Sequence, residues 1–475
     1  MKKIIAISFL CFAGTSLFGQ THTEKTFLLP QPMRIPTQNT LYDYGQYRMA
    51  RSENLWGAHF QMTGFFRWDD NETDIGQYFG RNGKNIIGIS EGGTDFLTSM
   101  LIHNTGDSAA KKLDGSIELR PDREVRGVHF SYLQQLTRVS KNIYFNIHAP
   151  VIHTTHSMNP KIIDNKKATI GTAEKGIGDY FSGNIEQTTN PDKQEALKYA
   201  KITGSQSRTD LADVDILLSY QFAKNNFYYL RSSIGGVIPT AKKPTGEYLF
   251  EPINGSGQQW GVQTGVEAMA VLHNTEDTKI DLTCSYNIKH FFSNTQKRTL
   301  GFRTPDWHSV FAWFHYELFG EKGKKGVFPA ANVLTRDVKV SQGLLFDCNL
   351  SFNIYHNNWL FNLGYNYFSR AEEDVTVKSW PNDTYARALG NYNTSNNFDC
   401  ATHGVGGFAT NSDMLNPSVA ATPALITHKL YGLVGGTFNS IRIPVTVAIG
   451  GAYEFCQDNS ALEGYELYFK AGVSF

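Results

Sequence analysis

The last twelve residues alternate between apolar side chains and polar or small ones. Tyr465, Leu467, Phe469, Ala471 and Val473 are apolar and lead to a terminal Phe475, while glycine, glutamate, tyrosine, lysine and serine hold the positions between. A period of two predicts a β-strand with one apolar face. A soluble antiparallel sheet with one buried face would give the same alternation. This strand, however, continues to the final residue, where soluble domains usually fray.

The same period recurs along the chain and predicts twelve strands. Several of these segments carry aromatic residues near both ends of the apolar face, as strands that cross two membrane interfaces do. The predicted strands are 56–68, 117–136, 142–152, 213–223, 227–238, 260–272, 279–291, 338–354, 359–370, 426–438, 442–455 and 464–475.

Short and long connections alternate between these strands. Turns such as 137–141 and 224–226 join neighbouring strands into hairpins, and long polar segments such as 292–337 and 371–425 separate the hairpins. This alternation is typical of membrane barrels, which have short periplasmic turns and long extracellular loops. Fourteen strands would follow if the segments from Asp95 to His103 and from Trp307 to Phe319 also cross the membrane.

The hairpin rhythm and the terminal strand together resemble Gram-negative outer-membrane β-barrels. The resemblance implies an all-β fold, a transmembrane antiparallel up-and-down barrel, surrounded by outer-membrane lipids. It also implies that Phe469, Val473 and Phe475 form the signal read by the barrel-assembly machinery. The long N-terminal segment and aromatic-rich loops are similar to those of fatty-acid transporters of the FadL type, although the short plug motif of that family is not evident here.

The N-terminus predicts export. Two lysines precede the apolar run 4–13 and the small residues 14–19, which is the arrangement of a secretory signal peptide. We therefore expect a signal peptide over 1–19, a periplasmic or lumenal segment over 20–54 and the barrel over 55–475. The predicted location is the cell outer membrane of a Gram-negative bacterium, reached through the periplasm.

Composition narrows the class of partner. The 44 basic residues equal the 44 acidic ones, so no long-range field favours nucleic acid. Aromatic residues make up 13% of the chain and glycines number 43, which suits a barrel with interfacial aromatic side chains and many turns. We expect no cofactor and no metal site.

Parity along the strands separates a lipid-facing set from a lumen-facing set. The outward set has almost no charge, whereas the inward set has charges of both signs. These charges indicate either a wet lumen or paired structural ladders. The predicted lumen-lining residues include Arg67, His129, Asn146, Asp215, Arg231, Glu267, Lys279, Asp281, Asp347, Glu454, Glu466 and Lys470.

The most direct functional interpretation is a porin-like channel for passive diffusion of small polar or amphipathic solutes, and not an enzyme. A structural or adhesin-type surface barrel with a blocked lumen is the alternative. A lipid hydrolase is a weaker alternative, because His129, Ser131 and Asn146 share the lumen face of two paired strands and outer-membrane phospholipases use a His, Ser and Asn set.

The four cysteines outside the signal peptide have no zinc-site spacing. Cys284 and Cys348 fall on neighbouring strands and are expected to be small apolar residues facing lipid. Cys400 and Cys456 fall on two long loops, and the oxidising periplasm permits a disulfide between them.

Overall fold

Twelve antiparallel strands close into a barrel in the computed structural model, which describes residues 20–34, 57–90, 95–103, 113–170, 173–189, 193–303, 312–388, 392–405, 409–438 and 444–474. The predicted signal peptide and Phe475 lie outside these residues. The strands pair in sequence around the ring, and β27 returns to β1. They are β1 (Ala58–Asp69), β5 (Asp122–Gln135), β6 (Ile143–Ser157), β11 (Val214–Lys224), β12 (Tyr228–Ile238), β13 (Gly261–Asn274), β14 (Thr278–Phe291), β20 (Leu345–His356), β21 (Trp359–Arg370), β25 (Leu425–Phe438), β26 (Val445–Cys456) and β27 (Gly464–Ser474).

The prediction of a closed barrel of twelve strands is confirmed, and the alternative of fourteen is wrong. Residues 95–103 contain β3 (Phe96–Leu97) and the short helix α4 (Thr98–Leu101). The described part of 307–319 forms the 3-10 helix η2 (Ala312–Tyr316) and the start of β17 (Leu318–Glu321). None of these elements pairs with a barrel strand, because their apolar side chains pack into a separate core.

The two faces of the barrel follow the predicted parity. Phe469 is 53% exposed on the outside, whereas its neighbours Tyr468 and Lys470 are buried inside. On the outside, aromatic rings form a continuous chain across seven strands. The chain lies near the strand ends that lead into the long loops, and the centroids of neighbouring rings are 4.7 to 6.2 Å apart. The chain consists of Phe66, Trp68, Tyr465, Tyr453, Phe455, His428, Tyr367, Phe346 and Tyr286.

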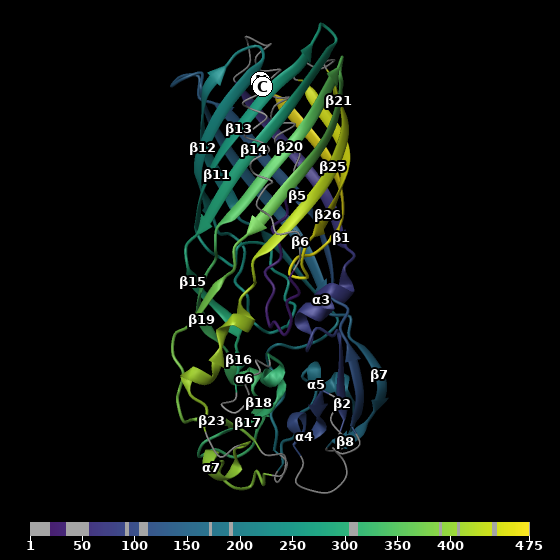
Figure 1. Cartoon of the computed structure of the whole chain (residues 1–475), viewed down its shortest axis with the longest axis vertical. Helices are drawn as coiled ribbons and strands as arrows, with labels where there is room; N and C mark the ends of the chain where they lie inside the picture. Colours follow the sequence, from purple (N-terminus) through teal and green to yellow (C-terminus); the bar gives the residue numbers. More distant parts are fainter. Residues whose placement is uncertain are drawn as a thin grey trace.

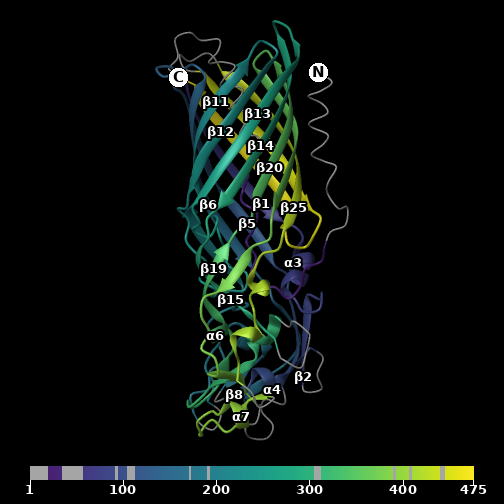
Figure 2. The same cartoon turned by 60° about the vertical axis from the view of Figure 1, so that its left-hand side comes forward.

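The long connections fold together into a second body at one end of the barrel, here called the long-loop region (Figures 1 and 2). It comprises the described residues of 70–121, 158–213, 239–260, 292–344, 371–424 and 457–463, and the barrel end that it covers is called the long-loop end. Its helices are α3 (Glu72–Phe79), α4, α5 (Ile177–Phe181), α6 (Ala331–Leu334) and α7 (Cys400–His403), with 3-10 turns η2, η4 (Ser412–Met414) and η5 (Pro417–Ala420).

Small sheets complete the long-loop region. Phe79, Phe181, Trp313 and Tyr316 come from three loops and meet in one buried core. The strands are β2 (Ile86–Ser90), β3, β4 (Asp114–Glu118), β7 (Lys161–Lys166), β8 (Ala168–Ile170), β9 (Ala173–Lys175), β15 (Asn294–Thr299), β16 (Gly301–Phe302), β17, β18 (Phe328–Pro329), β19 (Thr335–Ser341), β22 (Asp374–Val377), β23 (Tyr385–Arg387) and β24 (Leu415–Asn416). A further strand, β10 (Ser205–Leu211), pairs with the end of barrel strand β6.

Two predicted strands are each divided in the structure. The segment 117–136 separates near Pro121 into β4 and β5, since proline has no N–H for the ladder. The segment 338–354 separates around 342–344 into β19, which pairs with β15 and β22 in the long-loop region, and β20 of the barrel.

Residues 20–34 lie at the long-loop end of the barrel. Lys25 and Thr26 bond through their backbone N–H groups to Tyr78 O and Val419 O of the long-loop region. Pro32, Met33 and Arg34 line the lumen. The prediction placed 20–54 in the periplasm or the lumen. Of this range, residues 32–34 are lumenal, residues 22–29 pack among the long loops, and 35–54 lie outside the described residues.

Among the described residues, no helix combines the length and the apolar character that crossing a membrane as a helix requires.

Candidate lumen site

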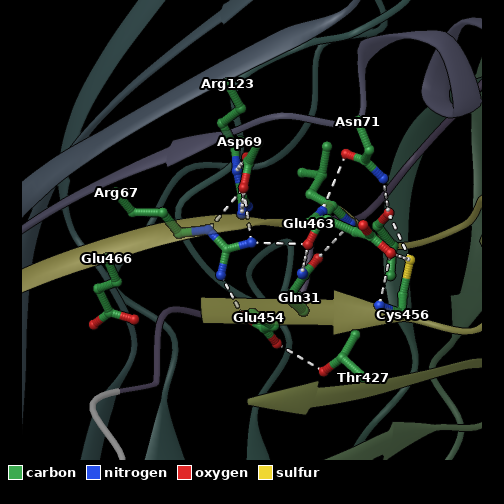
Figure 3. A network of polar contacts seen from close by, with 12 residues as sticks. Gln31, Arg67, Asp69, Asn71, Arg123, Thr427, Glu454, Cys456, Glu463 and Glu466 are labelled. Carbon is green, nitrogen blue, oxygen red and sulfur yellow. Dashed lines mark hydrogen bonds and ion pairs between the residues drawn. The ribbon is translucent and has the colours of Figure 1, made fainter. Parts of the chain in front are cut away.

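A network of buried charges occupies one side of the lumen (Figure 3). The Arg67 guanidinium on β1 donates to Asp69 Oδ1 at 2.8 Å and also pairs with Glu454 on β26. Arg123 Nε on β5 donates to the other Asp69 oxygen at 2.6 Å. All four side chains are almost completely buried. A charge at such a position is tolerated because opposite charges and hydrogen bonds surround it.

The N-terminal segment and β25 extend this network. Lys429 Nζ donates to Glu466 Oε2 at 2.9 Å and lies 3.4 Å from Glu454 Oε2. Arg34 pairs with Glu454, and its backbone carbonyl accepts a 3.0 Å bond from Lys429 Nζ. Glu454 is therefore surrounded by three cations, one of which comes from outside the barrel strands. We call these side chains the ion network: Arg34, Arg67, Asp69, Arg123, Lys429, Glu454 and Glu466.

The opposite side of the lumen contains a cavity of about 250 Å³. Charged side chains line it in pairs. Lys289 Nζ on β14 lies 2.6 Å from Asp215 Oδ2 on β11, and Arg231 Nη2 on β12 lies 2.6 Å from Glu267 Oε1 on β13. The first pair joins two non-adjacent strands, whereas Arg231 and Glu267 are direct neighbours on adjacent strands. The strands that line this cavity, here called the cavity sector, therefore enclose a space, whereas packed charges fill the ion-network sector.

The cavity lining has an apolar part and a polar part. The strand ends that enter the long-loop region supply a cluster of buried apolar side chains, here called the collar: Val237, Phe291, Leu345, Phe368 and Leu425, of which the first four line the cavity. The polar part begins beside the collar, where Asp215 pairs with Val237 and Lys289 with Leu345 in the strand register, and extends toward the short turns. It is here called the chamber: His129, Ser131, Asn146, His148, Asp215, Ser219, Arg231, Ser233, Gln263, Glu267, Ser285, Asn287, Lys289, Asn349 and Asn366.

The predicted lumen residues all lie on inward faces, but the structure separates them into groups. His129, Asn146, Asp215, Arg231, Glu267 and Asp347 line the cavity, and Arg67, Glu454 and Glu466 belong to the ion network. Lys279 and Asp281 form a 2.7 Å pair near a short turn. Lys470 is completely buried, with Nζ 5.6 Å from the centre of the Tyr468 ring.

Three lumen residues with central contacts are missing from the predicted lumen-lining residues named above. His148 on β6 pairs with Ser131 of β5 on one side and with Asp215 of β11 on the other. Lys289 lies on β14, and Arg34 lies in a segment with no periodicity. Parity identifies inward residues, but only strand register shows which of them meet.

The hydrolase hypothesis required Asn146 to orient His129. In the structure, Asn146 Nδ2 donates a long, 3.5 Å bond to Ser219 Oγ, and the His129 ring lies 5.6 Å from the His148 ring. The asparagine thus contacts a different strand from the one that the hypothesis assigned.

The expected disulfide between Cys400 and Cys456 is not formed, and all four described cysteines are free thiols. Cys400 packs in α7 against Phe398 and Leu318, whereas Cys456 Sγ donates to Asp458 O at 2.9 Å at the end of β26. Figure 1 places α7 at the far tip of the long-loop region and β26 in the barrel, so the two loops that carry these residues fold apart. Within the described ranges, no group of three or more His, Cys, Asp or Glu residues could hold a metal ion.

Comparison with known proteins gives structural neighbours only. No family model and no curated protein matches the chain. An outer membrane channel from Pseudomonas putida F1 has a TM-score of 0.38 and 9% identity, with 88% of this chain and 96% of that chain covered. The Pseudomonas putida toluene transporter TodX has a TM-score of 0.31 and 8% identity, with 97% of this chain and 99% of that chain covered. The translocator domain of the autotransporter NalP from Neisseria meningitidis has a TM-score of 0.29 and 6% identity, with 92% of this chain and 98% of that chain covered. The chain is thus similar to Gram-negative outer-membrane β-barrels, and the strand pairing itself establishes the closed barrel.

Proposed function

We propose that this protein is an outer-membrane channel through which small polar or amphipathic solutes diffuse passively. Outer-membrane lipids would surround the barrel, and the barrel-assembly machinery would insert it. The proposal joins two independent properties of the barrel, its exterior and its lumen.

The exterior supports membrane insertion. Leu363, Ile234 and Ile449 are at least 60% exposed on outward faces, which would be costly in water over so large a surface. The continuous chain of aromatic rings described above matches the girdles that mark a membrane interface. A charge introduced on this face near the bilayer midplane would cost about 2 to 4 kcal/mol.

The observation that carries the transport function is the cavity inside the closed barrel. Pairs of opposite charge line it, so it would have a wet interior without a strong preference for ions of one sign. The collar packs at the long-loop end of the barrel, the end from which solute from outside would arrive.

Planar-bilayer recording of the purified protein tests this function. Discrete conductance steps that require folded protein are expected. A silent bilayer, with folding confirmed by the shift of the unheated band on a denaturing gel, would overturn the channel.

The long-loop region favours a second candidate, a surface barrel that binds a partner. Loops from six connections share buried cores instead of extending separately into solvent. Such a body could present a fixed binding surface. A silent bilayer together with partner binding that depends on these loops would favour this function over the channel.

A further inference from the structure

We propose that the lumen cavity binds neutral amphipathic molecules, with the apolar part of the molecule in the collar and its hydrogen-bonding group in the chamber. The inference rests on the proposed function, because it names the class of solute that the channel would carry.

The collar provides the apolar half of the site. Val237, Phe291, Leu345 and Phe368 belong to four different strands, and each side chain both packs in the collar and lines the cavity. Met33 of the N-terminal segment adds a flexible apolar side chain to the same lining. An alkyl chain or an aromatic ring placed here would leave water for an apolar surface, which is favourable in proportion to the area buried.

Most charges of the cavity lining are already compensated, and Asp213 is the exception. Lys289 is paired with Asp215 and Arg231 with Glu267, each at 2.6 Å, and Arg34 is paired with Glu454. A charged solute would have to break one of these pairs or remain uncompensated, and either is unfavourable away from bulk water. Asp213 is the carboxylate without a cation partner in the described contacts; its Oδ2 accepts the Ser256 N–H at 2.8 Å. Cationic amphiphiles are therefore the class that the test must separate from neutral ones.

Neutral polar groups remain available in the chamber. Among the described residues, four neutral lining side chains each have one buried atom without a hydrogen-bond partner: Asn146 Oδ1, His148 Nδ1, Gln263 Nε2 and Asn349 Nδ2. Two charged lining side chains, Arg34 at Nε and Asp213 at Oδ1, also have one each. Their amides include both acceptors and donors, and leaving such groups unpaired costs free energy. A hydroxyl or an amide supplies both a donor and an acceptor, whereas a hydrocarbon supplies neither. The site therefore favours an amphiphile with a neutral polar head over a pure hydrocarbon.

Block of the ionic current by added solutes tests the inference. The probes are benzyl alcohol, benzoate, benzylammonium and toluene, which share one ring and differ in head group. Benzyl alcohol is expected to block with saturation and without voltage dependence, at concentrations at least tenfold below the three others. Equal or stronger block by benzylammonium, benzoate or toluene would overturn the inference while leaving the channel in place.

Variants test whether the block of the current by benzyl alcohol arises in the cavity. Asn146→Leu removes chamber hydrogen bonding and Phe291→Ala removes collar surface, and each should raise the blocking concentration of benzyl alcohol about tenfold. The matched control is Asn362→Leu, the same change at a lumen-facing asparagine outside the cavity lining, which should leave block unchanged. Equal loss in all three variants would assign the change to general damage, and unchanged block in all three would assign the block to the bilayer; either result would overturn the site.

The outcome in which no current flows is also informative. Saturation-transfer NMR of benzyl alcohol with the folded protein in amphipol then reads the binding directly. Binding that Asn146→Leu abolishes would support the site even though the channel function had failed, and absence of binding would overturn the site as well.

Discussion

The ion-network sector and the cavity sector of the lumen wall have the same kind of sequence pattern, but the first is filled by side chains and the second encloses a cavity. Both present charged and polar residues at every second position. In the ion-network sector, Arg34 and Glu454 bring together charges from several strands, and the Tyr468 ring lies where a side chain on Gly450 would be. In the cavity sector, Lys289 and Arg231 pair across the wall and leave a space of about 250 Å³. Inward charge alone therefore does not indicate a path for solutes. What matters is whether other side chains fill the space beside it.

The largest expected effect is the loss of Glu454. Glu454→Gln leaves Arg34, Arg67 and Lys429 without their shared carboxylate in a buried site, and breaking such a network should cost about 3 to 5 kcal/mol. Urea unfolding of the reconstituted barrel measures this. Glu267→Gln in the cavity sector is the matched control and should cost less, because its partner Arg231 borders the cavity. Equal losses would show that the sectors do not differ energetically.

Removal of the Arg34 side chain should extend the cavity toward the ion network. Arg34 lines the cavity and also pairs with Glu454, so Arg34→Ala should enlarge the lumen and raise the single-channel conductance. Lys25→Ala, a change in the same N-terminal segment but in the long-loop region, serves as the control. An unchanged conductance in Arg34→Ala would show that this side chain does not separate the sectors.

The pair in the cavity should influence ion selectivity. Asp215→Asn leaves Lys289 uncompensated and should shift the permeability toward anions, while Lys289→Met should shift it toward cations. The double variant should return close to the original selectivity, since the two effects cancel. Reversal potentials in a salt gradient measure all three proteins, and additive shifts of the same sign would contradict the pairing.

The smallest effect is expected outside both sectors. Burial raises the pKa of Glu317 in the long-loop region to about 7, despite the neighbouring Arg387. Because this folded-state pKa exceeds the usual value, the protonated carboxyl stabilises the folded state relative to the unfolded state. This contribution to folding stability is fully present below about pH 4.5 and is lost as the pH rises through about 7. Hydrogen exchange of the segment 312–321 should therefore be slower at pH 5 than at pH 8, after correction for intrinsic exchange. Glu317→Gln should remove the difference, and a pH effect that persists would exclude this carboxyl.

The barrel was predictable because its strands carry a local signal. A residue such as Phe469 faces lipid and Lys470 faces the lumen, and this alternation is visible without knowledge of any partner. The long-loop region has no such period. Its core depends on contacts such as Trp313 Nε1 donating to Phe79 O, which joins residues more than 200 positions apart. The aromatic segment around 307–319 therefore suggested another strand, although aromatic side chains of its described part, 312–319, pack into the buried cores of this region.

The sequence by itself determined the closed barrel, its twelve strands and which side chains face inward, because a strand exposes alternate residues to two different solvents. Only the tertiary structure decided which inward residues meet. Arg34 reaches Glu454 from a segment without periodicity, His148 lies opposite Asp215 through strand register, and Cys400 and Cys456 fold apart. Those outcomes depend on register, barrel closure and loop packing, and none of these is specified by the residues nearby in the chain.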